Sequence, residues 1–176
     1  NSDKVNPQRK HYGTILHTGI QFIKSGKAKA VLEVKANWLD NKGGVVLEES
    51  TKVEFIAKGK QRIIDRTTTL KAINGKVEMK DVKDGFFAIR VARELDHPSQ
   101  IPDLRTDATV KVTTIKTINN KQVTGSYRNK EGIEGDSAWG KSSAWCNLRG
   151  TINGENISVA IIDHPKNLGY PSYWHA

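Results

Sequence analysis

The sequence has little cysteine and no long apolar run, and both shortages limit what the protein can be. Cys146 is its only cysteine, so no disulfide can form within the chain. The lack of a disulfide does not indicate in which cellular compartment the protein works, because exported proteins without disulfides are common. Cys146 has apolar neighbours in AWCNL, and we expect a buried core residue rather than a reactive thiol. No stretch approaches the roughly eighteen apolar residues of a membrane helix, so we expect no membrane span.

Helical periodicity is also missing, because no apolar pattern recurs at helical spacing over about ten residues. Apolar and polar residues instead alternate with a period of two in many stretches. Residues 28–38 place Ala, Leu, Val and Trp on one face and Lys, Glu and Asn on the other, and the turn sequence DNKGG at 40–44 then favours an antiparallel hairpin over 28–57. Further strand patterns occupy residues 13–24, 62–72, 86–92, 108–118, 143–148 and 157–162.

These patterns predict an all-β fold, with about eight to ten antiparallel strands arranged as a sandwich. Residues 92–107 and 125–140 carry prolines, glycines and charges and are predicted to be loops, the first beginning with one helical turn. A chain of 176 residues suits one core better than two, so we expect a single domain over residues 1–176.

Familiar catalytic and metal-binding motifs are absent. The sequence has no GxSxG elbow, phosphate-binding loop or dinucleotide fingerprint. The tetrapeptide GDSA at 135–138 resembles the nucleophile region of trypsin-like proteases, but Trp139 follows where that family has glycine, so we attribute it to chance. The five histidines show no short paired spacing, and we expect no metal and no other cofactor. His97 precedes a proline in a charged loop and is expected to be solvated.

Positive charge is plentiful, with 28 Lys and Arg residues against 19 Asp and Glu residues and a formal net charge of +9. The lysines fall singly, with acids between them, as on the solvated faces of strands. No zinc finger, basic helix or aromatic RNA-binding motif accompanies them. We therefore do not expect nucleic-acid binding, although a basic surface is its first requirement.

The most unusual stretch lies near the end of the chain, where DHPKNLGYPSYWH at 163–175 packs two His, two Pro, two Tyr, one Trp and one Asp. A glycine-rich and aromatic stretch, DSAWGKSSAWCNLRG at 136–150, precedes it. Aromatic rings in these stretches could offer flat faces to sugar C–H groups, or could instead close the end of the core. If the protein has a site, we expect it here.

Polar side chains complete the expected site. A histidine near an acid can transfer protons at neutral pH, so Asp163, His164 and His175 are the candidate catalytic residues. Arg90 interrupts the apolar run FFAIRVA, where its guanidinium must reach solvent or find an acid, either in a structural ion pair or in a ligand site. The candidate substrate-binding residues are Arg90, Trp139, Lys141, Asn167, Tyr173 and Trp174.

The chain resembles the PmoA family, also called methane oxygenase PmoA, a bacterial domain of unknown function. The stretches that carry the resemblance are GTILHTGI, WLDNKGGVVLEES, RIIDRTTTLKA, DVKDGFFAIRVA, WGKSSAWCNLRG and DHPKNLGYPSYWH. The resemblance implies a sandwich similar to the galactose mutarotase fold, which holds carbohydrate in several enzyme classes. It also implies an exported protein, periplasmic or extracellular, in a polysaccharide-degrading bacterium. Family members extend beyond this sequence at both ends, so we expect a fragment of a longer domain.

From the residues and the resemblance together we expect a domain that binds or processes carbohydrate. Two other hypotheses stay open. A non-catalytic module could use the same aromatic residues to contact a protein partner, and the family's name implies a metal-dependent oxidoreductase.

Overall fold

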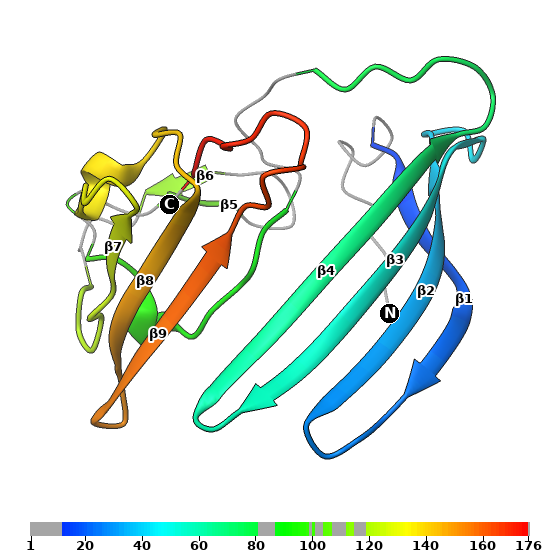
Figure 1. The fold of residues 1–176 in the computed structure, drawn as a ribbon. Coiled ribbons are helices and arrows are strands. Elements are labelled where there is room, and N and C mark those ends of the chain that lie inside the picture. Colours follow the sequence, from blue (N-terminus) through cyan, green and yellow to red (C-terminus); the bar gives the residue numbers. More distant parts are fainter. Residues whose placement is uncertain are drawn as a thin grey trace, which may run out of the picture. The chain divides into compact units, whose positions relative to one another are not determined.

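The structure is a computed structural model that describes residues 12–80, 87–98, 100, 104–106, 112–114 and 119–175, and nearly all of its regular elements are antiparallel strands (Figure 1). The chain divides into two compact units, Asn1–Lys80 and Asp81–Ala176. Each unit contains its own antiparallel sheet. The expected all-β class is therefore confirmed, and a four-stranded and a three-stranded sheet are consistent with a sandwich. That the whole chain behaves as one domain stays a prediction.

The first unit is a four-stranded sheet in the order β1-β2-β3-β4, in which every neighbouring pair is antiparallel. Its strands are β1 Thr14–Lys24, β2 Lys29–Leu39, β3 Val45–Lys58 and β4 Gln61–Ala72. The turn between β2 and β3 closes because Oδ1 of Asp40 accepts the backbone N–H groups of Lys42 and Gly44, both at 2.8 Å. The hairpin predicted over residues 28–57 is confirmed.

The register of this sheet places a buried carboxylate beside two neutral donors and one guanidinium. Glu49 is 9% exposed, and its Oε2 accepts the indole N–H of Trp38 at 2.7 Å. Its Oε1 accepts the hydroxyl of Thr51 at 2.5 Å and a guanidinium N–H of Arg66 at 3.2 Å. Burial alone would raise the pKa of Glu49, but these hydrogen bonds and the charge of Arg66 hold the pKa below its usual value.

The second unit combines a three-stranded sheet, β7-β8-β9, with a short pair of strands, β5-β6, and two single-turn helices. Its elements are η2 Arg93–Leu95, β5 Leu104–Thr106, β6 Val112–Thr114, β7 Ser126–Asn129, η3 Gly135–Ala138, β8 Trp145–Ile152 and β9 Glu155–Ile162. The core of this unit contains Leu95, Ala138, Cys146 and Leu148, all buried. The expected buried cysteine is thus observed.

The tight turn between β8 and β9 has the chemistry that its sequence predicts. Asn153 and Gly154 both have positive φ, 51° and 82°, which these two residue types tolerate best. The strands on either side pair in continuous register from Trp145 opposite Ile162 to Ile152 opposite Glu155. The last predicted strand pair is confirmed.

Two predictions about local structure are wrong. Residues 87–92, the described part of the run predicted as a strand at 86–92, form no strand, and Arg90 is exposed, so the guanidinium is not confined within a strand. Conversely, β7 lies inside the stretch 125–140 that was expected to be a loop, because its four residues are too few for the alternation to stand out. Of the predicted strand at 108–118, only β6 lies within the described residues.

The helices of the described residues are short. They are η2, with three residues, and η3, with four. Neither they nor any other helix in the described ranges has the length and apolar character needed to cross a membrane.

Candidate functional site

The segment that follows β9 folds back and is fastened to the segment that precedes β8. The backbone N–H of Gly140 donates to Trp174 O at 2.7 Å, and that of Trp174 donates to Lys141 O at 3.1 Å. The backbone N–H of Ser143 donates to Ser172 O at 3.1 Å. We call the paired residues 139–143 and 172–175 the aromatic ledge, because each of its two segments carries exposed rings.

Asp163 closes the loop between β9 and the aromatic ledge. Its Oδ1 accepts the side-chain N–H of Asn167 at 2.7 Å, and its Oδ2 accepts the backbone N–H and the hydroxyl of Ser172 at 2.8 and 3.0 Å. Burial of this carboxyl group, which is 8% exposed, would raise its pKa, but these hydrogen bonds outweigh burial and lower it. Asp163 is therefore an ionised acceptor whose two oxygens both hold the loop.

Two aromatic side chains of the ledge face solvent. Trp139 is 51% exposed and Tyr173 is 76% exposed. The ring of His175 meets the ring of Trp139 edge-on, with centroids 5.5 Å apart and an interplanar angle of 84°. Trp174 is different, because it is half-buried and its indole N–H donates to Ser143 O at 2.8 Å. Trp174 thus stabilises the ledge through its hydrogen bond, whereas the rings of Trp139 and Tyr173 are accessible to a ligand from solvent.

Of the predicted site residues, the structure gathers Trp139, Lys141, Tyr173, Trp174 and His175 in the ledge. The side chain of Lys141 is exposed there. Asn167 belongs to the adjoining loop and bonds Asp163, so its side-chain amide is already engaged. No hydrogen bond or ion pair links Arg90 to the ledge among the described residues.

The proposed proton-transfer groups lie close in sequence but are not arranged as an acid–base pair. The Nδ1 of His164 accepts the backbone N–H of Lys166 at 3.2 Å, so a neutral ring carries its proton on Nε2. Within the described part of the chain, neither His164 nor His175 forms an ion pair with a carboxylate. The catalytic roles of Asp163, His164 and His175 stay a prediction.

His97, expected to be solvated, is instead built into the second unit. Its Nδ1 lies 3.0 Å from Gly125 O, and its Nε2 lies 3.2 Å from Oδ1 of Asp136. Its ring also lies 6.0 Å from the ring of Tyr127. Because Gly125 and Asp136 follow far along the sequence, only the fold reveals these partners.

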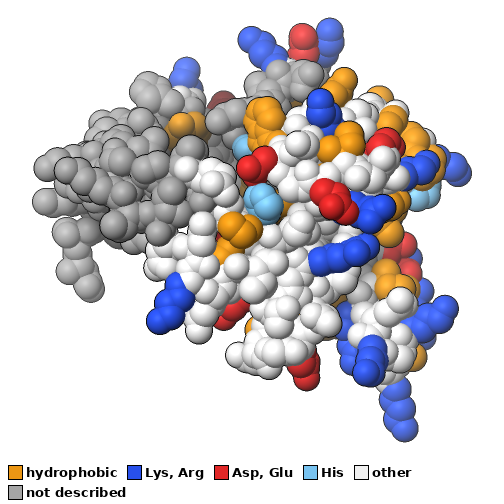
Figure 2. Space-filling view, turned by 90° about the vertical axis from the view of Figure 1, so that its left-hand side faces the viewer, with side chains coloured by type: hydrophobic (Ala, Val, Ile, Leu, Met, Phe, Trp, Pro, Cys, Tyr) orange, Lys and Arg blue, Asp and Glu red, His pale blue; other side chains and the backbone are white. Residues whose placement is uncertain are grey.

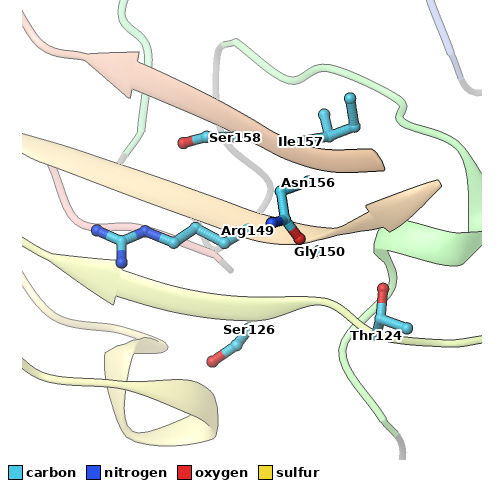
Figure 3. A pocket seen from close by; sticks show the side chains of 7 residues that line it. All are labelled: Thr124, Ser126, Arg149, Gly150, Asn156, Ile157 and Ser158. Atoms are coloured by element: carbon cyan, nitrogen blue, oxygen red, sulfur yellow. The ribbon is translucent and has the colours of Figure 1, made fainter. Parts of the chain in front are cut away.

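A hollow on the β7-β8-β9 sheet was also missed by sequence reasoning. It has a volume of about 410 Å³ and is open to solvent (Figure 3). The available signal was the alternation of polar residues along β8, at Asn147, Arg149 and Thr151, but the same alternation is ordinary on a solvated strand. The residues that line the hollow are Thr124, Ser126, Arg149, Gly150, Asn156, Ile157 and Ser158.

The distribution of charge and of possible metal ligands bears on two further predictions. On the part of the face that Figure 2 colours by type, Lys and Arg side chains occur together with Asp and Glu side chains. The absence of nucleic-acid binding stays a prediction. No group of three or more potential metal ligands occurs among the residues that the structure describes, and His11 lies outside them.

Comparison with known proteins assigns a family and no activity. The model of a family of unknown function, DUF6807, matches residues 1–176, so the chain belongs to that family. No curated protein and no solved structure matches. The resemblance to PmoA is therefore wrong, since the matching family is DUF6807 and nothing points to PmoA. The oxidoreductase hypothesis rested on the PmoA name alone and is withdrawn with it.

Proposed function

We propose that this member of the DUF6807 family binds carbohydrate through the aromatic ledge. The observation that carries the proposal is that Trp139 and Tyr173 are exposed on a backbone that is hydrogen-bonded along both of its segments. Large exposed rings expose apolar area to water, and sugars can cover that area with their C–H faces. A ledge held in place by its own hydrogen bonds loses little conformational freedom when the ligand binds.

The polar groups beside the rings suit sugar hydroxyls. Lys141 lies between Trp139 and the rest of its ledge segment and offers an exposed ammonium donor. The imidazole of His175, in edge contact with Trp139, offers both a donor and an acceptor. Rings that cover C–H faces next to groups that bond hydroxyls are the two requirements of a sugar-binding surface.

The geometry favours binding over catalysis at this ledge. Glycosidic bond cleavage uses a pair of carboxyl groups, one on each side of the scissile bond. Asp163 is the only carboxylate of residues 163–175. Both of its oxygens accept hydrogen bonds from the loop, and Asp163 is only 8% exposed, so a bound sugar has little access to this carboxylate.

The proposal is tested by affinity electrophoresis and calorimetry with a panel of neutral and acidic polysaccharides. We expect Trp139→Ala and Tyr173→Ala each to weaken binding by about tenfold, because each removes a stacking face. Tyr173→Phe keeps the ring and is expected to retain most of the affinity. Leu168→Ala is the matched control, since Leu168 is fully exposed in the same loop but has no flat ring.

Two outcomes would reject the proposal. If no saccharide binds, or if Leu168→Ala weakens binding as much as Trp139→Ala, the aromatic ledge does not bind sugar by stacking. A protein-interaction module, the rival hypothesis, would bind no purified saccharide. A sugar-processing enzyme would release products from a bound polysaccharide and lose turnover in His164→Ala and His175→Ala.

A periplasmic or extracellular location would bring such a protein to its polysaccharide, and it stays part of the proposal. Fractionation of cells that produce the natural protein is the direct measurement. Recovery from the cytoplasmic fraction would contradict it.

A further inference from the structure

The hollow on the β7-β8-β9 sheet combines three side chains from three neighbouring strands. In the antiparallel register, Arg149 on β8 lies opposite Ser126 on β7 and opposite Ser158 on β9. Side chains directly opposite each other in a sheet point to the same face. Figure 3 shows the three side chains next to one another, with the guanidinium of Arg149 extended along its strand.

This face of the sheet is the solvated one. Cys146 and Leu148 alternate with Arg149 along β8 and are buried on the opposite face, against the core. Arg149, Ser126, Asn156 and Ser158 are all exposed. A ligand can therefore reach the hollow without any rearrangement of the core.

The guanidinium of Arg149 is held in place but keeps most of its donors. Its Nε–H donates to Oδ1 of Asn147 at 3.0 Å, and the amide of Asn147 donates in turn to the hydroxyl oxygen of Ser158 at 2.8 Å. The terminal nitrogens of Arg149 make no hydrogen bond with another described residue. No carboxylate of the described ranges lies within ion-pair distance of them, so the positive charge is uncompensated there.

The flanking hydroxyls add further donors. The oxygen of Ser158 already accepts a bond from Asn147, so its own hydrogen is free to point outward. The hydroxyl of Ser126 makes no hydrogen bond with another described residue. A guanidinium fork between two O–H donors matches an oxoanion with two coplanar oxygens far better than it matches a neutral hydroxyl.

We propose that this hollow binds the carboxylate or sulfate group of an acidic saccharide, an inference that rests on the proposed function for the saccharide part of the ligand. Arg149 makes the paired bonds to two anion oxygens, and Ser126 and Ser158 donate to their remaining lone pairs. A phosphate backbone is disfavoured as the ligand, because the cross-strand neighbours of Arg149 are neutral and phosphate recognition along a strand requires several cations in succession.

The test compares polygalacturonic acid with its methyl ester, which has the same backbone without the charge, and dextran sulfate with dextran. Calorimetry is carried out on the full chain at physiological salt. We expect the acidic member of at least one pair to bind about tenfold more tightly than the neutral member, and Arg149→Gln to abolish that preference. Arg149→Lys keeps the positive charge but lacks the two parallel N–H donors of a guanidinium, so it is expected to retain only part of the preference for the acidic saccharide.

The matched control is Arg128→Gln, which removes one positive charge from the same face of the sheet, where Arg128 is paired with Glu134 at 3.3 Å. This variant is expected to keep the preference. If acid and neutral forms bind alike, the anion site is rejected while the proposed function stands. If no saccharide of either pair binds, the anion site is rejected, and the wider polysaccharide panel decides the proposed function separately. Tighter binding of single-stranded DNA that is lost in Arg149→Gln would replace the saccharide with a phosphate ligand.

Discussion

At the scale of single residues, Asp163 has a structural role in the fold, whether or not it also takes part in catalysis as the sequence predicts. It stands beside His164, which suggested an acid–base pair. In the structure it accepts three hydrogen bonds, from Asn167 and from Ser172, and its ionised form is favoured. The side chain therefore stabilises the loop that carries the aromatic ledge.

We predict that Asp163→Asn lowers the free energy of unfolding by about 2 to 3 kcal/mol. The amide NH₂ group would replace one carboxylate oxygen and would then face a donor of Asn167 or Ser172 without accepting its hydrogen bond. Urea denaturation of the variant and of the unsubstituted protein measures this difference. Glu155→Gln is the control, since Glu155 is exposed at the β8–β9 turn, and it should cost little. An equal loss in both variants would mean that charge alone, not the loop hydrogen bonds, sets the effect.

The same residue predicts a pH dependence with a definite sign. The pKa of Asp163 is lowered by folding, so its contribution is complete above the unfolded pKa of about 3.9 and is lost as the pH falls through the folded value. The stability difference between the unsubstituted protein and Asp163→Asn should therefore be constant near neutral pH and shrink below about pH 4. A difference that persists unchanged in acid would contradict this assignment.

At the scale of elements, the packing of η2 against the β7-β8-β9 sheet depends on close backbone contact. The backbone N–H of Gly125 donates to Asp96 O at 2.9 Å, and the N–H of Thr124 donates to Glu94 O at the same distance. A Cβ atom built on Gly125 would collide with the carbonyl oxygen of Leu95. Leu95 is itself 2% exposed, so this backbone has little room to move away.

We predict that Gly125→Ala destabilises the second unit by about 3 kcal/mol, since the added methyl group must displace backbone rather than a flexible side chain. Thermal denaturation followed by tryptophan fluorescence measures the change. Gly19→Ala is the matched control, because a Cβ atom there meets only the end of the Gln21 side chain, at 3.7 Å. Equal losses of thermal stability in the two variants would show that the backbone of η2 can move to accommodate the added methyl group.

At the scale of the whole molecule, the chain has two compact units whose buried carboxylates have separate partners. The bonds to Glu49 come from Trp38, Thr51 and Arg66, all in the first unit. Those to Asp163 come only from residues of the second unit. In the hydrogen bonds of the described residues, no residue bonds both Glu49 and Asp163.

We therefore predict that Glu49→Gln and Asp163→Asn act additively. Each should be destabilising, and the double variant should lose the sum of the two losses to within about 0.5 kcal/mol. Urea denaturation of the two single variants and the double variant completes the cycle. A coupling energy well above that value would show that the two units stabilise each other through these groups.

Much of the fold could be predicted from the sequence because its signals are local. The alternation in residues 28–38, the DNKGG turn and the Asn153-Gly154 turn each depend on neighbouring residues, and each corresponds to a strand or turn in the structure. The strand expected at 86–92 does not form over its described residues, 87–92, because an apolar run alone does not determine which segments pair.

The sequence by itself determined the all-β class, the hairpin over 28–57, the last strand pair and the aromatic segment at 163–175. Only the tertiary structure decided what the polar residues do, because hydrogen-bond partners are set by distances between segments remote in the chain. It places Trp139 against His175, engages Asp163 in its own loop and sets Arg149 between Ser126 and Ser158. The two candidate surfaces, ledge and hollow, follow from those long-range contacts.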